Sequence, residues 1–168
     1  MKTITRSNVY LTMAAMILTA AIAVTAAAQN QVPLKGTFEG NDTVSPGPSP
    51  TTALLRTTAT GTGTHMGRFS FTQELTINET NGTDAGSAQW IAANGDNIYT
   101  TVVGSAIPGS VVFTITEIHT ITGGTGRFSG AQGSFTVHRT HVVAPNDDGT
   151  HITSGWFEGS MTSPGTTH

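Results

Sequence analysis

The sequence predicts an all-β protein built as an eight-stranded antiparallel β-barrel, and three observations lead to this fold class. Apolar and polar residues alternate with a period of two through most of the chain after residue 28, as strands with one buried face require. Turn residues recur about every ten positions, which is typical of a barrel or a sandwich. The segments Gly36–Gly40 (GTFEG) and Gly155–Gly159 (GWFEG) are alike, and pairing between them would close the sheet. A sandwich with Greek-key connections is the alternative.

The first 28 residues have the basic, apolar and small-residue parts of a secretory signal peptide. Lys2 and Arg6 precede an uncharged run from Leu11 to Ala28, which ends in three alanines. We expect a signal peptide helix over residues 1–28, followed by a single β-barrel domain over 29–168 that is secreted, either extracellular or periplasmic. An uncleaved membrane anchor is the alternative for this segment.

The composition excludes several classes of function. The chain has no cysteine, so disulfides, thiolate metal sites and cysteine nucleophiles are ruled out. Charged residues make up 10% of the chain and the formal net charge is −3, so the sequence has no basic surface for nucleic acid and no polybasic membrane patch. Threonine, serine and asparagine supply the polar surface, which suits an extracellular β-protein.

Eight strands are expected after the signal segment. Each is an alternating stretch bounded by Gly, Pro, Asn, Asp or Ser. They are Leu34–Asn41, Thr52–Thr60, Arg68–Asn78, Ala85–Ala93, Asn97–Gly104, Ser110–Thr122, Gly133–Val143 and His151–Met161.

The connections have recognisable turn chemistry. Ser45–Pro50 contains three prolines and is expected to be a loop, because proline has no backbone donor for a sheet ladder. Asn94–Asp96 and Asn146–Gly149 are predicted hairpin turns. The tetrapeptide GRFS occurs at Gly67–Ser70 and again at Gly126–Ser129, and we expect both copies to form the same bend.

The segment Ile121–Gly133 (ITGGTGRFSGAQG) predicts a glycine-built return between two long strands. A nucleotide-binding loop is excluded, because the third glycine of the fingerprint is missing and a strand follows where a helix is needed.

Candidate site chemistry lies on the two strands joined by this return. Glu117 and His119 share one face with apolar residues, and Arg139 lies on the corresponding face of the next strand. If paired residue numbers sum to 256, Glu117 is opposite Arg139. Two interpretations stay open: an inert buried ion pair that keeps Glu117 ionised, or an unpaired, protonated carboxyl available for catalysis.

No metal site is expected. His138 and His141 point to opposite faces of their strand, and the assumed register separates His141 from His119 by roughly 13 Å.

The return also resembles known families. ITGGTGRFSGAQG is similar to the Gly-Gly-Thr-Gly-x-Phe-x-x-Ala-x-Gly signature of dirigent proteins and to the Ile-Thr-Gly-Gly-x-Gly-x-Phe of allene oxide cyclases. The resemblance implies a calycin-like barrel. Glu39-Gly40-Asn41 and Ser49-Pro50 resemble the Glu-x-Asn and Ser-Pro of the cyclase cavity, which implies that Glu39 polarises a ligand and that Asn41 holds a water.

The expected function is binding of an apolar small molecule in the barrel lumen, with a cofactor-free isomerisation or cyclisation if the protein is an enzyme. The catalytic candidates are Glu117 and Glu39. The ligand-binding candidates are Asn41, Phe113, His119, Arg139 and Pro50. The alternative is a non-catalytic extracellular carrier or interaction barrel with a filled core. Assembly into homo-oligomers is left open.

Overall fold

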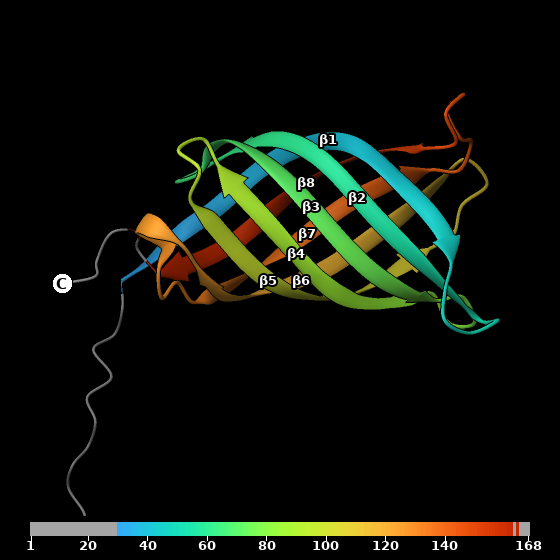
Figure 1. Cartoon of the computed structure of the whole chain (residues 1–168), viewed down its shortest axis with the longest axis horizontal. Coiled ribbons are helices and arrows are strands. Elements are labelled where there is room, and N and C mark those ends of the chain that lie inside the picture. The colour runs from blue at the N-terminus through green and yellow to red at the C-terminus, as the bar shows by residue number, and fades with distance from the viewer. Residues whose placement is uncertain (1–29, 163, 165–168) are drawn as a thin grey trace, which may run out of the picture.

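The computed structural model describes residues 30–162 and 164, and the predicted signal segment lies outside these residues. Eight antiparallel strands form a closed barrel in which every strand pairs with its neighbours in chain order and β8 pairs with β1 (Figure 1). The strands are β1 Gln31–Pro46, β2 Thr52–Gly63, β3 Gly67–Asn78, β4 Thr83–Ala92, β5 Asn97–Ile107, β6 Val112–Gly124, β7 Gly133–Val142 and β8 His151–Thr162. The barrel, and not the sandwich, is therefore the correct alternative. No helix in the described part of the chain is long and apolar enough to span a membrane.

The two related segments at the ends of the barrel pair as the sequence predicts. Gly36 lies opposite Phe157, and Phe38 lies opposite Gly155. A β-carbon on Gly36 would lie 2.7 Å from the Phe157 ring, so the glycine makes room for the facing phenyl group inside the barrel. Glycine and phenylalanine thus alternate across the seam that closes the sheet.

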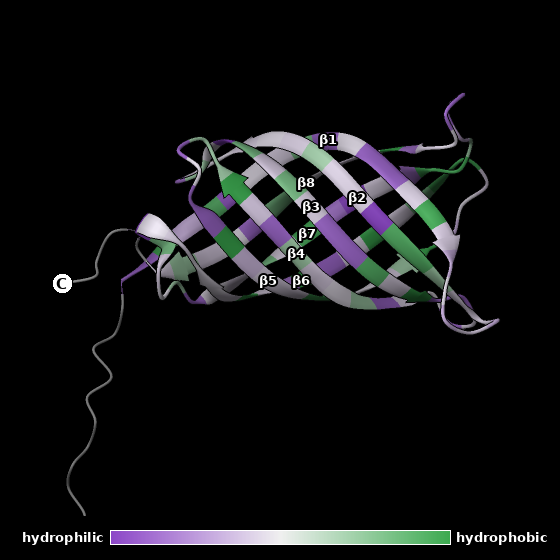
Figure 2. Cartoon of the chain, in the orientation of Figure 1, coloured by the Kyte–Doolittle hydropathy of each residue, from purple (hydrophilic) through white to green (hydrophobic). Residues whose placement is uncertain are grey.

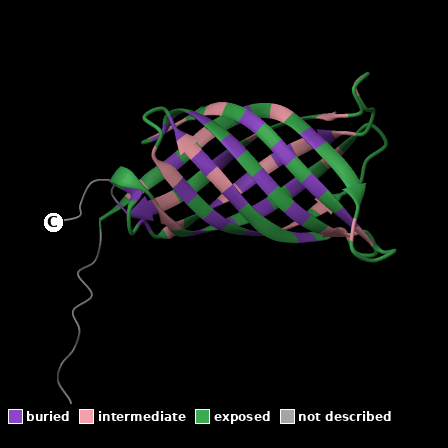
Figure 3. Ribbon diagram, in the orientation of Figure 1, coloured by how far each residue is buried: buried purple, intermediate pink, exposed green. Residues whose placement is uncertain are grey.

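Buried and exposed residues alternate along the strands, so each strand sends one side-chain set into the lumen and the other into solvent (Figure 3). Trp90 is fully buried at the centre of an aromatic cluster. Its ring stacks on Phe71 at 4.1 Å between centroids and contacts Phe69, Phe135 and Phe157 at 5.2–5.3 Å. These rings fill one part of the lumen.

The two barrel ends differ. The end that we call the return end carries the connections 64–66, 93–96 and 125–132, together with the start of β1 and the end of β8 (left in Figure 1). The 3-10 helix η2, Gly126–Phe128, lies there, and its Phe128 is buried in the core cluster. The opposite end, the proline-loop end, carries the connections 47–51, 79–82, 108–111 and 143–150.

Three sequence-based expectations need correction. The two GRFS copies do not form the same bend: both begin with a glycine of positive φ (+66° at Gly67, +54° at Gly126), but Gly67 pairs with Gly63 and starts β3, whereas Gly126 starts η2. The first strand extends through Pro46, at the sheet's end, so the loop begins at Gly47. The β6–β7 pairing places Ile115 opposite Arg139 and Glu117 opposite Val137, so the predicted register is two residues wrong. The shift is an even number, so the faces are unchanged.

Candidate functional site

The lumen holds a buried cluster of charged and polar side chains next to the aromatic cluster. Glu117, His119 and Arg139, all predicted site residues, point inward and are almost completely removed from solvent. Asp42 and Asp84, which were not predicted, join them from β1 and β4. The cluster lies between the aromatic rings and the proline-loop end, because Asp42 and Asp84 lie near the ends of their strands there.

Arg139 joins two buried carboxylates. Its Nε and Nη2 donate to Oε1 of Glu117 at 3.0 and 2.8 Å, and its Nη1 donates to Oδ2 of Asp42 at 2.9 Å. Nη1 also contacts the hydroxyl of Thr153 at 3.3 Å. Arg139 and Glu117 are diagonal neighbours in the observed register, and the arginine side chain is long enough to reach across. The predicted ion pair therefore forms although the two residues are not directly opposite.

Other strands complete the hydrogen bonding of these carboxylates. Thr57 donates its hydroxyl to Oδ1 of Asp42 at 2.6 Å, and Nδ1 of His141 lies 2.7 Å from Oδ2. The side-chain amide of Gln73 donates to Oε1 of Glu117 at 3.1 Å. Side chains from several strands around the barrel therefore contact the carboxylates of Asp42 and Glu117, and these contacts fix the positions of both anions.

Glu117 is held ionised. Burial acts to raise its pKa, but Arg139, together with His119, lowers it to about 2. Burial also lowers the pKa of His119, so this imidazole is neutral near pH 7. Its Nδ1 lies 3.1 Å from the hydroxyl of Thr100. Of the two interpretations of Glu117, the structure supports the ionised carboxylate paired with arginine.

Asp84 has the opposite electrostatic environment. Burial, together with the negative charge of Glu117, raises its pKa to about 7 against the opposing effect of Arg139. Asp84 and Glu117 lie on either side of Gly104: a β-carbon built on that glycine would be 2.8 Å from Oδ1 of Asp84 and 2.7 Å from Cγ of Glu117. Two neighbouring carboxyl groups whose pKa values are separated in this way are suited to different roles in acid–base chemistry.

Several polar atoms of this cluster have no protein hydrogen-bond partner although they are buried. Nε2 of His119 and Oε2 of Glu117 are 3.6 Å apart, which is too long for a hydrogen bond. Oδ1 of Asp84 and Oε1 of Gln73 are also unpaired. Since buried polar atoms are normally satisfied, these four atoms hold hydrogen-bonding capacity that the protein itself does not use.

The other predicted residues do not reach this cluster. The resemblance implies cavity positions for Glu39 and Asn41, but both are exposed on the outer face of β1, because Phe38 and Asp42 occupy the inward phase of the strand. Pro50 is exposed on the proline loop. Phe113 is half-buried near the proline-loop end, with its ring 6.0 Å from that of His141.

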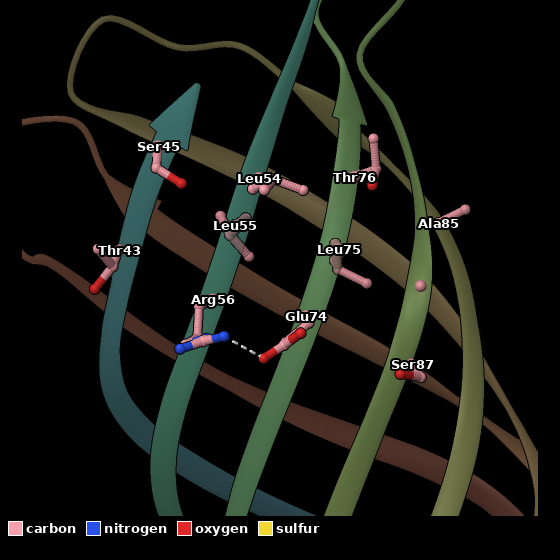
Figure 4. Close-up of a pocket in the computed structure, with 11 residues that line it drawn as sticks. Thr43, Ser45, Leu54, Leu55, Arg56, Glu74, Leu75, Thr76, Ala85 and Ser87 are labelled. Atoms are coloured by element: carbon pink, nitrogen blue, oxygen red, sulfur yellow. Dashed lines mark hydrogen bonds and ion pairs between the residues drawn. The ribbon is translucent and has the colours of Figure 1, made fainter. Parts of the chain in front are cut away.

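The outer surface also carries hollows. Figure 4 shows one between β1 and β4, where Arg56 and Glu74 form an exposed ion pair beside Leu54 and Ser87. Within the described residues, no group of three or more histidine, aspartate or glutamate side chains is arranged to hold a metal ion.

No protein-family model and no curated protein matches the chain. Among solved structures, the chain is similar to the pterocarpan synthase dirigent protein GePTS1, with a TM-score of 0.54 and 13% identity over 80% of this chain and 89% of that one. It is also similar to the pterocarpan synthase dirigent protein PsPTS1, with a TM-score of 0.51 and 12% identity over 82% of this chain and 98% of that one. The closed eight-stranded antiparallel barrel of this chain is the barrel fold of the dirigent proteins.

Proposed function

We propose that the protein is a secreted dirigent-like barrel that binds an apolar small molecule in its lumen and steers a cofactor-free cyclisation of that molecule. The observation that carries this proposal is the pair of lumen carboxyl groups with separated pKa values, Asp84 at about 7 and Glu117 at about 2. The two solved structures named above are of pterocarpan synthase dirigent proteins, so a barrel of this fold can carry synthase activity, which supports an enzymatic role.

Asp84 would act as the general acid. It donates its proton to a substrate hydroxyl, the C–O bond breaks with release of water, and positive charge develops on the carbon. A second hydroxyl of the same molecule then attacks that carbon, closes a ring, and returns its proton to Asp84. The substrate loses one water in total, and no oxidant or cofactor is needed.

The fixed charges of the lumen favour the cationic intermediate. The two carboxylates of Asp42 and Glu117 face the single guanidinium of Arg139, so this group of three carries a net negative charge. Preorganised negative charge in a dry site stabilises positive charge that develops on a substrate. Oε2 of Glu117, which has no hydrogen-bond partner, is the candidate atom to supply this stabilisation.

Apolar side chains surround the proline-loop end, which is the end nearest Asp84. Figure 2 shows hydrophobic residues in the strand ends and loops there. These exposed apolar residues, with exposed fractions between 37% and 72%, are Val44, Ile107, Val111, Val112 and Val143. An apolar rim of this kind suits the entry of an apolar guest.

A second candidate function is a non-catalytic extracellular barrel. The aromatic cluster around Trp90 favours it, because these rings already fill part of the lumen. Under this alternative the charged network serves only to fix the strand register.

Uptake and turnover of a defined substrate panel separate the two functions. The panel consists of benzylic alcohols with a second hydroxyl group placed to close a ring ether by loss of water. We expect native mass spectrometry to detect a one-to-one complex and chromatography to detect ring closure. Asp84→Asn should bind comparably and lose at least about 100-fold in rate. Glu39→Gln, on the outer face, is the matched control and should retain the wild-type rate. Absence of any complex, or an unchanged rate in Asp84→Asn, would contradict the proposal.

The raised pKa of Asp84 also predicts a pH dependence of stability. The folded protein keeps this proton up to about pH 7, whereas the unfolded chain releases it near the ordinary value of 3.8. The folded state therefore binds more protons between these values, so the stability that Asp84 contributes is fully present below about pH 4 and is lost as the pH rises through about 7.

Asp84→Asn removes this titration and keeps a similar side-chain shape. We expect the difference in Tm between wild type and Asp84→Asn to change by about 3–6 °C between pH 5 and pH 8.5, with the wild type losing more as the pH rises. Differential scanning calorimetry at matched ionic strength measures it. Parallel Tm curves for the two proteins would show that Asp84 is already ionised at pH 5.

A further inference from the structure

The outer face of the barrel carries a row of side chains that neither the core nor the lumen uses. The register places Trp156 beside His138 on β7 and beside Thr37 on β1, and it continues the row through Thr62 on β2 to Arg68 on β3. Trp156 is 45% exposed, which is unusual for so large an apolar ring on a strand.

One face of the indole ring is already covered. The ring of His138 stacks against it, with centroids 4.3 Å apart and planes inclined by 25°. Because β8 lies between β7 and β1, the opposite face of the ring is directed toward Thr37. Thr37, the strand neighbour of Trp156, lines a polar groove, so Trp156 lies next to that lining and not within it.

The groove runs over the outer faces of β1 and β2. Its polar lining consists of four hydroxyl side chains, one carboxylate and one guanidinium. These are Thr37, Thr60, Thr62, Ser154, Glu39 and Arg68. Glu39 lies directly opposite Ser154 and Thr60 in the sheet, so the carboxylate is at the centre of the hydroxyl groups. Within the described residues, neither Glu39 nor Arg68 forms an ion pair, which leaves both free to contact a ligand.

We propose that Trp156 and this groove bind a β-linked oligosaccharide of all-equatorial pyranose units, such as glucose or xylose. A pyranose of this type has a flat face of C–H groups that stacks on an exposed aromatic ring, and a rim of hydroxyl groups around it. The carboxylate of Glu39 accepts hydrogen bonds from vicinal hydroxyls, the guanidinium of Arg68 donates to them, and the threonine and serine hydroxyls do both. A neutral polar guest fits a groove in which one positive and one negative charge balance.

This surface is independent of the lumen function. Thr37 and Glu39 point outward while Phe38 between them points into the core, so one strand thickness separates the groove from the interior. A variant in one site therefore leaves the other testable.

Tryptophan fluorescence offers a direct test, because the chain has two tryptophans and Trp90 is fully buried. Collisional quenching by acrylamide thus reports mainly on Trp156. We expect cellohexaose or xylohexaose to protect the fluorescence from quenching and to bind in isothermal titration calorimetry. Trp156→Ala should weaken binding by at least about tenfold, Glu39→Gln should weaken it by several-fold, and Trp156→Phe should retain most of the affinity measured by calorimetry.

Ile152→Ala is the matched control, since Ile152 is a large apolar residue exposed on the outer face of the same strand and does not line the groove. It should bind like the wild type. Two results would overturn the proposal: neither hexasaccharide binds at millimolar concentration, or Trp156→Ala binds with wild-type affinity. In either case the Trp156–His138 pair serves only to stabilise the sheet, and Trp156→Ala would then change stability without any effect on sugar.

Discussion

Replacement of Arg139 by methionine lowers the free energy of unfolding by about 3–5 kcal/mol at neutral pH. Methionine approximates the volume of the aliphatic stem but removes the positive charge that lies 2.8 Å from Glu117 and 2.9 Å from Asp42. Two buried anions then face each other without a cation, and the hydrogen bonds to both are lost. Urea denaturation followed by far-ultraviolet circular dichroism measures the change.

The pH dependence of this variant separates loss of charge from loss of packing. Arg139 is a main reason why the pKa of Glu117 is low, so in Arg139→Met that pKa rises and Glu117 takes up a proton in mildly acidic solution. We therefore expect the deficit relative to wild type to shrink between about pH 7.5 and pH 5. A triple variant, Arg139→Met with Asp42→Asn and Glu117→Gln, should recover most of the lost stability. A deficit that is equal at both pH values and in the triple variant would assign the effect to packing.

The fold could be predicted from the sequence because its signals are local. Alternation with a period of two fixes which side chains face inward, and Gly, Pro and Asn mark where strands end. Closure depends on a long-range contact, yet it was predictable because Gly36–Gly40 and Gly155–Gly159 have matching small and aromatic positions that pair across the seam.

The register between β6 and β7 could not be fixed in the same way. Any even sum of paired numbers keeps Glu117 and Arg139 on the inner face, so the pattern cannot distinguish 254 from 256. The contact formed in spite of the shift because arginine is long enough to reach a diagonal neighbour across a strand pair. The two GRFS copies show the opposite limit: both begin with a left-handed glycine, yet their identical residues adopt different structures, because Gly67 pairs with Gly63 across the β2–β3 hairpin whereas Gly126 lies in the longer β6–β7 connection and begins η2.

The two carboxylates that sequence analysis missed have a common cause. Asp42 follows the predicted end of the first strand by one residue, and Asp84 precedes the predicted start of the fourth by one. An aspartate beside a turn is ordinarily a solvated turn residue, so each strand appeared to stop short of it. The signal that could have found them is their spacing along the strand. Asp42 is an even number of residues from Phe38, and Asp84 is an even number from Trp90, so each aspartate lies on the same inward face as its aromatic neighbour. Glu39 was selected by motif resemblance, and its phase, opposite to that of Phe38, correctly predicts an outward position.

The second large effect is expected at Trp90, which connects the aromatic cluster to the charged cluster. Its ring contacts Phe71, Phe135 and Phe157 on one side of the network and lies 5.5 Å from the ring of His119. We expect Trp90→Ala to lower the free energy of unfolding by about 3–5 kcal/mol, because the removed ring leaves a cavity that the rigid closed barrel cannot collapse to fill.

Trp90→Phe is the informative control for this variant. The indole Nε1 of Trp90 is buried without a hydrogen-bond partner, so phenylalanine removes an unsatisfied donor while it keeps most of the aromatic contact. We therefore expect Trp90→Phe to cost less than half as much as Trp90→Ala in urea denaturation. If the lumen instead has room to relax around a missing ring, the two variants will have similar stabilities, close to that of the wild type. That result would show that the aromatic cluster is loosely packed and does not fix the positions of His119 and Glu117.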